Sequence, residues 1–219
     1  MNDPISEIVL RKLQAYFPPD EVEWRVGPTN LDDGDEEGRG MALPYIPARR
    51  VQQRLDNVVG PFGWQLKFNE PVNKQKSMPA GVEASIGVRD PFSPDQWVWK
   101  ADVSQNTQTE PMKGGYSKAV VRAGVAWGVG RYLYYIDQDM WVDVEKKYGS
   151  VQFKNEPDLP AEFRPENQPS HRFTNKQTRR LREACKGKSV EAVNEVFDEE
   201  KNFQTLLEDI QNLSDESST

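Results

Sequence analysis

The fold of this chain is decided by the stretch Tyr116–Ile136, which reads YSKAVVRAGVAWGVGRYLYYI. Read as a helix, this stretch places small residues at helical spacing from Ala119 to Gly130, along one face. Such a face lets a helix lie close against a sheet or another helix. Lys118 and Arg122 stand one turn apart on a neighbouring face. We predict a buried helix over 116–136 whose cations are either solvated surface charge or a contact for an anion.

Composition indicates one globular domain with a smaller appendage. The chain has 219 residues, 36% of them hydrophobic, including six Trp and nine Phe that can fill a core. No apolar run approaches the roughly 20 residues that span a bilayer, and the N-terminal residues lack the apolar core of a signal peptide. We expect a soluble cytoplasmic protein, associated with the nucleoid if it binds DNA.

The scarcity of reactive side chains argues against several kinds of chemistry. Cys185 is the only cysteine and His171 the only histidine, so neither an intrachain disulfide nor a histidine-based metal site or triad is expected. The sequence has no GxxxxGK[ST] phosphate loop, nucleophile elbow, HExxH or CxxC pair. The pair Gly128 and Gly130 lacks the third glycine and the preceding strand of a dinucleotide site. We predict a protein without cofactor or metal that is not an enzyme.

The net charge of −7 is unevenly distributed. The segment from Asn194 to Thr219 contains eight acids and one lysine and carries the whole of that charge, so the remainder is neutral. Five further acids lie between Asp32 and Glu37, which leaves +5 on everything outside these two segments. A mildly basic body with an acidic loop and tail is compatible with binding a polyanion.

Residue patterns between Ile5 and Val59 predict two helices separated by a loop. Helical spacing over Ile5–Phe17 ends at a proline pair, and Val22–Val26 is a candidate strand. The stretch Gly27–Leu43 is rich in glycine and acids but lacks the spacing of a calcium loop, so we predict a solvated loop. A second helix is predicted over Pro47–Val59, because proline suits a first helical turn and a Gly-Pro pair follows.

This second helix carries cations beside its apolar stripe. Arg50, Arg54 and Asn57 fall at i, i+4 and i+7, next to a stripe of apolar residues that begins at Val51. The arginines are either surface charge, partly paired with Asp56, or a face that meets an anionic ligand.

Three runs of alternating apolar and polar residues begin at Trp64, Val82 and Trp97. Consecutive runs of period two, joined by loops with Pro, Gly and Asp, predict an antiparallel meander with one buried face. Trp64, Trp97 and Trp99 lie on the apolar side of their patterns, so we assign them to the core rather than to an exposed stacking surface. The predicted fold class is α+β, with a β-β-β-α core flanked by helices.

The pattern weakens after Trp141. Four prolines between Asn155 and His171 predict a linker, and short helices are predicted over 174–186, 190–197 and 203–213 before a disordered end. We divide the chain into a main domain (1–153), a proline-rich linker (154–173) and a helical acidic C-terminal segment (174–219).

Two motifs resemble those of a known family. The segments YIPARR (45–50) and VGPFGW (59–64) are similar to the first helix and strand entry of Rad52-type single-strand annealing proteins. The segment 117–134, which ends in GVGRYLY, resembles their second helix, closest to the bacterial and phage branch that includes DdrA-like DNA repair proteins. Helix, three-stranded meander and helix also follow the family's order, so the resemblance covers roughly Pro44 to Ile136.

The resemblance implies a function that composition does not. Members of this family assemble into rings or related oligomers through the β-β-β-α unit, bind single-stranded DNA along a positive groove and anneal complementary strands without ATP. Arg50 falls at the position of the family's DNA-facing arginine in the first helix, and the adjacent basic pair of the second helix falls on Val121 and Arg122. Only Arg122 is basic here, and Lys118 is a candidate replacement for the missing cation.

We therefore predict a protein that anneals single-stranded DNA in recombination and repair. The candidate DNA-binding residues are the cations of the two helices and the meander: Arg49, Arg50, Arg54, Lys67, Lys100, Lys113, Lys118, Arg122 and Arg131. Two alternatives are a protein that protects single-stranded ends with little annealing, and a metal-dependent nuclease, although the acids near the meander show no metal-ligand spacing. Arg50 and Arg122 are expected to converge on one trough that continues from subunit to subunit.

The C-terminal segment has three candidate roles. It can recruit a replication or recombination protein, compete with DNA through its acids, or form a solvated helical extension.

Overall fold

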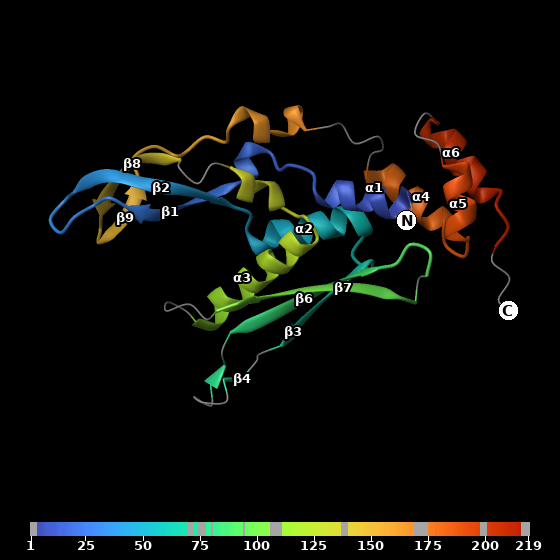
Figure 1. Ribbon diagram of the computed structural model, residues 1–219, viewed down its shortest axis with the longest axis horizontal. Coiled ribbons are helices and arrows are strands. Elements are labelled where there is room, and N and C mark those ends of the chain that lie inside the picture. The colour runs from blue at the N-terminus through green and yellow to red at the C-terminus, as the bar shows by residue number, and fades with distance from the viewer. Residues whose placement is uncertain are drawn as a thin grey trace.

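The protein is elongated, with its sheets and helices arranged along one axis (Figure 1). This computed structural model describes residues 4–69, 72–73, 78–79, 81–93, 95–105, 111–136, 140–168, 175–197 and 201–215. A four-stranded sheet lies at one end and the C-terminal helices at the other. Between them, helices lie over a three-stranded sheet, from which the short ribbon of β4 (Val72–Asn73) and β5 (Met78–Pro79) projects. The α+β fold class is thus confirmed.

The elements predicted at the N-terminal end are present. They are α1 (Pro4–Leu13), which ends four residues before the predicted Phe17, β1 (Glu23–Thr29) and α2 (Ala48–Val59); the 3-10 turn η1 (Pro19–Glu21) was not predicted. The apolar stripe of α2 is buried, as its period predicts, and Gly60 ends the helix with a φ of 81°.

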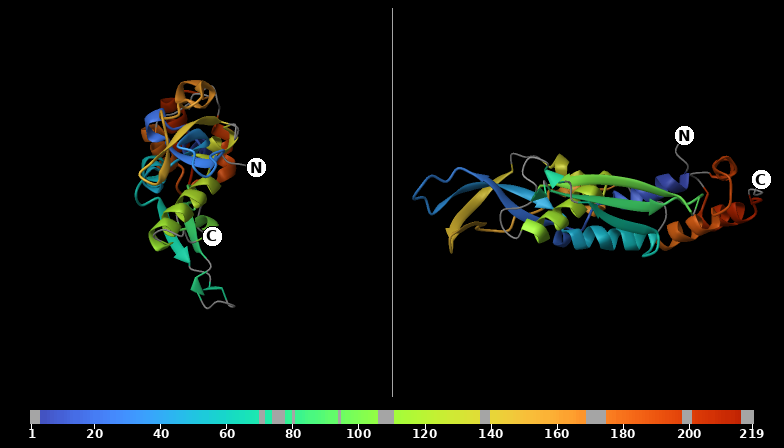
Figure 2. Two further views of the ribbon diagram at one scale, coloured as in Figure 1. Left: turned by 90° about the vertical axis from the view of Figure 1, so that its left-hand side faces the viewer. Right: turned by 90° about the horizontal axis from the view of Figure 1, so that it is seen from below.

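The predicted meander is one antiparallel sheet. It consists of β3 (Trp64–Asn69), β6 (Val82–Arg89) and β7 (Trp97–Ser104), in the order β3-β6-β7. Helix α3 (Pro111–Ala126) packs across one face of this sheet, over β6 and β7, and α2 lies beside α3 toward β3. Seen from below, the sheet lies in front of the helices (Figure 2).

Gly124 permits the close approach of α2 and α3. A Cβ atom at this position would stand 2.6 Å from Cγ1 of Val51 on α2. That distance is shorter than any ordinary carbon contact, so a side chain here would push the helices apart.

The helix predicted over 116–136 ends ten residues earlier than expected, at Ala126. Gly128 and Gly130 adopt positive φ angles of 93° and 67°, and the 3-10 turn η2 (Arg131–Tyr135) follows. A left-handed backbone cannot continue a right-handed helix, so the two glycines end α3. Beyond this point the apolar period that suggested a helix belongs to η2.

The assignment of Trp97 and Trp99 to the core is wrong. Cross-strand register pairs Ile86 with Lys100 and Gly87 with Trp99, so Trp99 and Trp97 lie on the face that points away from α3. We call this the outer face. Alternation fixed which residues share a face of β7, but pairing with β6 decides which face is covered.

Most of the predicted loop over Gly27–Leu43 is strand. Its second half is β2 (Glu37–Tyr45), which pairs with β1 on one side and with β8 (Trp141–Lys147) on the other, and β9 (Ser150–Phe153) completes the sheet. The acids remain in the connection between β1 and β2. Strand β8 was missed because its partner β2 is about a hundred residues away, which local periodicity does not register, and β9, which pairs with β8, was missed with it.

Part of the predicted linker packs against the main core. Leu159 is 1% exposed, and the segment forms the turns η3 (Ala161–Phe163) and η4 (Pro165–Asn167). The Gln168 side chain accepts a hydrogen bond from the backbone N–H of Tyr16 (2.5 Å). Residues 155–168 therefore pack against the main core and against the segment that follows α1.

The three predicted C-terminal helices are confirmed as α4 (Asn175–Ala184), α5 (Val190–Val196) and α6 (Phe203–Gln211). They enclose a second hydrophobic core in which Cys185 is fully buried, and α4 also packs on α1 and α2. Thr174, the first residue of the first predicted helix, and residues 216–219 of the predicted disordered end lie outside the described residues.

Candidate nucleic-acid interface

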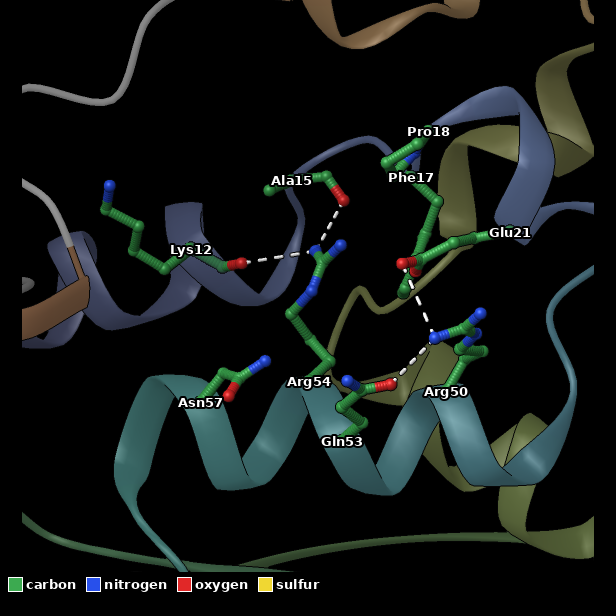
Figure 3. A pocket seen from close by; sticks show the side chains of 9 residues that line it. All are labelled: Lys12, Ala15, Phe17, Pro18, Glu21, Arg50, Gln53, Arg54 and Asn57. Atoms are coloured by element: carbon green, nitrogen blue, oxygen red, sulfur yellow. Dashed lines mark hydrogen bonds and ion pairs between the residues drawn. The ribbon is translucent and has the colours of Figure 1, made fainter.

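A cleft of about 370 Å³ lies between α1, η1 and α2 (Figure 3). Helix α2 contributes Arg50, Gln53, Arg54 and Asn57 to its lining, so the face predicted from the i, i+4, i+7 spacing is the one that lines the cleft. The opposite wall includes the carboxylate of Glu21.

Arg54 stabilises the end of α1. Its Nη1 donates to the backbone oxygens of Lys12 (3.3 Å), Leu13 (3.4 Å) and Ala15 (2.5 Å). The helix stops here, and the guanidinium supplies donors for the carbonyls at its end; the Lys12 oxygen also accepts from the backbone N–H of Ala15 (3.4 Å). The guanidinium carbon lies 3.8 Å from the centroid of the Phe17 ring. Burial lowers the pKa of Arg54 to about 10, which leaves it charged at neutral pH.

Arg50 is more accessible. Its Nη1 donates to Oε1 of Gln53 (2.9 Å) and lies 3.4 Å from Oε1 of Glu21, and its side chain is 37% exposed. Both contacts use Nη1, so a phosphate can approach the remainder of the guanidinium. An exposed ion pair contributes little stability, and a polyanion can displace Glu21 from it.

An aromatic cluster holds the wall of the cleft opposite α2. The backbone N–H of Phe17 donates to the hydroxyl of Tyr132 (3.0 Å), whose ring stacks on Tyr16 at 4.2 Å between centroids. Phe163 packs on Tyr132 at 6.3 Å. Burial is the main cause that raises the pKa of Tyr132 to about 12. Tyr132, the first tyrosine of the GVGRYLY motif, therefore positions Phe17 and the residues that lead into η1.

Lys100 and Arg131 bind the C-terminal end of α3. Arg131 donates from Nε and Nη2 to the carbonyl of Val125 (3.0 and 2.7 Å), and Nη2 also donates to Ala126 (2.8 Å). Nζ of Lys100 donates to the same Ala126 carbonyl (3.1 Å) and lies 4.4 Å from the Trp127 ring centroid. Burial, and then the neighbouring charge of Arg131, lower the pKa of Lys100. Both cations complement the negative end of the helix dipole.

Arg122 lies on the far flank of α3 from Arg50. Its Nη2 is 3.1 Å from Oδ1 of Asp102 on β7, and its side chain is 51% exposed. Lys118, one turn earlier, is exposed and has no ion-pair partner within the part of the chain that the structure describes. Helix α2 contacts α3 at Gly124, toward β3, whereas Arg122 reaches over β7. Within one chain, Arg50 and Arg122 do not share a cleft.

The remaining predicted cations are separate from both sites. Lys67 lies on the outer face of the three-stranded sheet, where its Nζ is 4.0 Å from the Trp99 ring centroid. Arg49 is exposed at the start of α2. The side chain of Lys113 lies outside the described residues.

Sequence reasoning missed the wall of the cleft that α1 and η1 supply. Lys12, Phe17 and Glu21 line it, and none of them belongs to a motif. Burial lowers the pKa of Lys12, which is 8% exposed. One signal was available. The proline pair placed the end of α1 at Phe17, four residues too late, but any helix end has unpaired carbonyls that require a donor nearby.

The arrangement suits binding of a polyanion along exposed arginines. No group of His, Cys, Asp and Glu in the described part of the chain could hold a metal ion. None of the described helices has the length and apolarity needed to cross a bilayer. The accessible functional groups are therefore donors for phosphate oxygens, on α2 and on α3.

Comparison with known proteins agrees with this geometry. A family model described as Rad52/22 family double-strand break repair protein matches residues 6–151. The single-stranded DNA-binding protein DdrA of Deinococcus deserti is 28% identical over 166 residues, which is 74% of this chain and 73% of that protein. DdrA of Deinococcus radiodurans is 28% identical over 162 residues, or 73% and 69% of the two chains. The match spans α1 to β8 and includes both helices that carry the exposed arginines, and the chain belongs to the Rad52/22 family of double-strand break repair proteins.

Proposed function

We propose that the protein binds single-stranded DNA and anneals complementary strands during recombination and DNA repair, without ATP. The family match over residues 6–151 carries this proposal, and the two DdrA relatives are named single-stranded DNA-binding proteins. Arginine contacts to phosphates hold a strand without reading its sequence, because each contact meets a repeating charge. Base pairing with a second strand then supplies all the specificity, and no catalytic group is needed.

We further propose that Arg50 and Arg122 contact the DNA backbone from neighbouring copies of the chain. The two side chains lie on opposite flanks of α2 and α3, so one copy alone offers two separate sites. In a ring or ring-like oligomer, Arg50 of one copy and Arg122 of the next line a common groove. Lys118 extends this groove along α3. It supplies the positive charge that members of the family carry at the position of Val121.

Salt-dependent binding tests the groove. Arg50→Ala and Arg122→Ala each reduce the affinity for an oligo(dT) strand, and each lowers the slope of log K against log salt by about 0.7, because one phosphate contact is lost. Lys147→Ala is the matched control, since Lys147 pairs with Glu145 on the distant four-stranded sheet. If the double variant Arg50→Ala/Arg122→Ala binds as the wild type does, the proposed groove is wrong.

An annealing assay and a measurement of mass complete the test. Wild-type protein should accelerate pairing of complementary oligonucleotides, and light scattering should show an oligomer with and without the strand. Protection of a strand from nuclease without acceleration of pairing would instead identify an end-protecting protein. A monomer that binds the strand would refute the shared groove while leaving single-strand binding intact.

A further inference from the structure

We propose that the outer face of the three-stranded sheet is a second contact for single-stranded DNA, one that stacks bases on Trp97 and Trp99. This inference rests on the proposed function, because it assumes that the strand is bound. It adds a site for nucleobases, whereas the groove of arginines contacts phosphates.

The geometry of Trp99 presents a flat aromatic surface. A Cβ at Gly87 would lie 2.8–2.9 Å from three atoms of the Trp99 ring, so the indole lies directly against the glycine backbone. Gly87 is opposite Trp99 in the strand register. The absence of a side chain at Gly87 is therefore what lets the ring lie flat, with its other face turned outward.

Each tryptophan is accompanied by a cation. Nζ of Lys67 lies 4.0 Å from the centroid of Trp99, and the guanidinium carbon of Arg89 lies 5.0 Å from that of Trp97. The two indole centroids are 6.3 Å apart. Because Gly87 occupies one side of the Trp99 ring, the ammonium of Lys67 stands on the outward side.

Flat aromatic rings with cations beside them are the features that bind a single strand. A base can replace the Lys67 ammonium on the indole, since base stacking is stronger than an exposed cation–π contact, and the ammonium then turns to a phosphate. Figures 1 and 2 show no described helix over this face, and the β4–β5 ribbon lies at one end of it. Among the described strand residues of this face the acid is Glu83, which lies toward the opposite end of β6 from Arg89. The charge beside the tryptophans is therefore complementary to phosphate.

The two proposed sites are neighbours around one edge strand. Strand β7 lies at the edge of its sheet, with Asp102, the partner of Arg122, on the α3 side and Trp99 on the outer side. These two residues are three positions apart, roughly 10 Å along a strand. A strand whose phosphates contact Arg122 can therefore pass around β7 and place its bases on the tryptophans. Duplex bases are already paired and stacked, so the outer face selects single strands.

Matched oligonucleotides with and without bases test this site. Trp97→Ala and Trp99→Ala should each weaken binding of oligo(dT) about tenfold, without changing the affinity for an abasic strand of equal length or the slope against salt. Trp99→Phe, which keeps a flat ring, should retain most of the affinity. Gly87→Ala should also weaken oligo(dT) binding, because the added methyl group lifts the Trp99 ring. The control is Val103→Ala, since Val103 is 45% exposed on the same face and offers no ring for stacking.

Each outcome decides between this site and its alternatives. Equal losses on oligo(dT) and on the abasic strand, or an equal loss in Val103→Ala, would overturn the stacking site. Dissociation of the oligomer by Trp97→Ala or Trp99→Ala would assign the face to contact between copies instead. Failure of the wild type to bind either strand would refute the proposed function itself, whereas normal binding that is insensitive to the tryptophans refutes only this inference.

Discussion

Three cations that the sequence offers to DNA are bound to carbonyls at helix ends. Arg54 holds the end of α1, while Lys100 and Arg131 hold the end of α3. Their charge still adds to the field of the molecule, but their donors are partly used by the fold. Arg50, Lys118 and Arg122 are the better candidates for direct contact with phosphate. Substitution of a cation that binds a helix end should therefore lower the free energy of unfolding more than substitution of a cation that is free to contact DNA.

Arg54→Ala should lower the free energy of unfolding by about 3 kcal/mol, because it removes charged hydrogen bonds to three carbonyls and a contact with Phe17. Arg50→Ala should lower it by less than about 1 kcal/mol, since its ion pair is exposed. Urea denaturation of both variants measures the difference. Comparable destabilisation by the two substitutions would contradict the assignment.

Tyrosine titration at high pH provides a second test at this scale. Burial first, and then a hydrogen bond to Glu23, raise the pKa of Tyr45 to about 12 from a usual value near 10. The folded protein keeps this proton where the unfolded chain has lost it, so Tyr45 makes stability fall as pH rises from about 10 toward 12. Tyr45→Phe should make the pH dependence of the unfolding free energy less steep in that range and reduce the late phase of the absorbance titration near 295 nm, which Tyr132 shares. Loss of absorbance change near pH 10 instead would show that Tyr45 ionises normally.

Among single residues, spacing identified faces but not partners. The i, i+4, i+7 pattern correctly placed Arg50, Arg54 and Asn57 along one cleft. It could not reveal that Arg54 binds carbonyls of α1, because backbone acceptors leave no mark on the side-chain pattern. Similarly, alternation grouped Trp97 with Trp99, but the face on which they lie depends on register with β6. Such register arises from contacts between segments, which one segment's pattern does not contain.

At the scale of elements, the contact between α2 and α3 decides how the two arginine-bearing helices are held. Gly124 meets Val51 there, and because a Cβ at position 124 would stand only 2.6 Å from the valine, no side chain fits without a shift. The small-residue face predicted for α3 runs through Ala119 and Ala123, which are fully buried, but it did not include Gly124, the residue that meets α2. The end of the helix was misjudged because an apolar period continued through η2, although the two glycines marked the boundary.

A double-mutant cycle tests this helix contact. Gly124→Ala should lower the unfolding free energy by about 1 kcal/mol, because overpacking by about 1–3 kcal/mol exceeds the roughly 1 kcal/mol gained from helix propensity. In the double variant Gly124→Ala/Val51→Ala the new methyl group occupies space vacated by the valine, so its destabilisation should be smaller than the sum of the single effects. Urea denaturation of the four proteins measures the coupling. Strict additivity would show that the two helices do not meet at this pair.

At the scale of the whole molecule, acidic and basic regions are segregated. The acids of the C-terminal helices lie at one end of the elongated structure and those of the β1–β2 connection at the other (Figure 1). Helices α2 and α3 carry a net positive charge and lie between them, and α4 of the C-terminal bundle is basic as well. The C-terminal helices also pack on α1 and α2, and Nη2 of Arg179 donates to the backbone oxygen of Asn57, a residue of the cleft (3.3 Å). The bundle residue that contacts the cleft is thus a cation of α4, and the acids Glu195 and Glu208 lie on α5 and α6, from which they oppose a strand at α2 only through the longer-range field.

Neutralising exposed acids on these helices should strengthen DNA binding. Glu195→Gln together with Glu208→Gln should raise the affinity for oligo(dT) about threefold at low salt, and the gain should disappear at high salt, where charges more than a few ångströms apart are screened. Asp33→Asn together with Glu36→Gln provides a control of equal charge at the opposite end of the molecule. An equal gain from both pairs would indicate a general effect of net charge rather than local opposition.

The position of the lone cysteine gives the molecule an internal reporter. Cys185 is fully enclosed by α4, α5 and α6, and the chain has no other thiol. A thiol reagent can modify the native protein only when this bundle opens. The rate of labelling therefore measures the local opening of the bundle, independently of the main core. Labelling rates of Cys185 measured with and without bound single-stranded DNA would show whether DNA binding changes the opening of the C-terminal bundle.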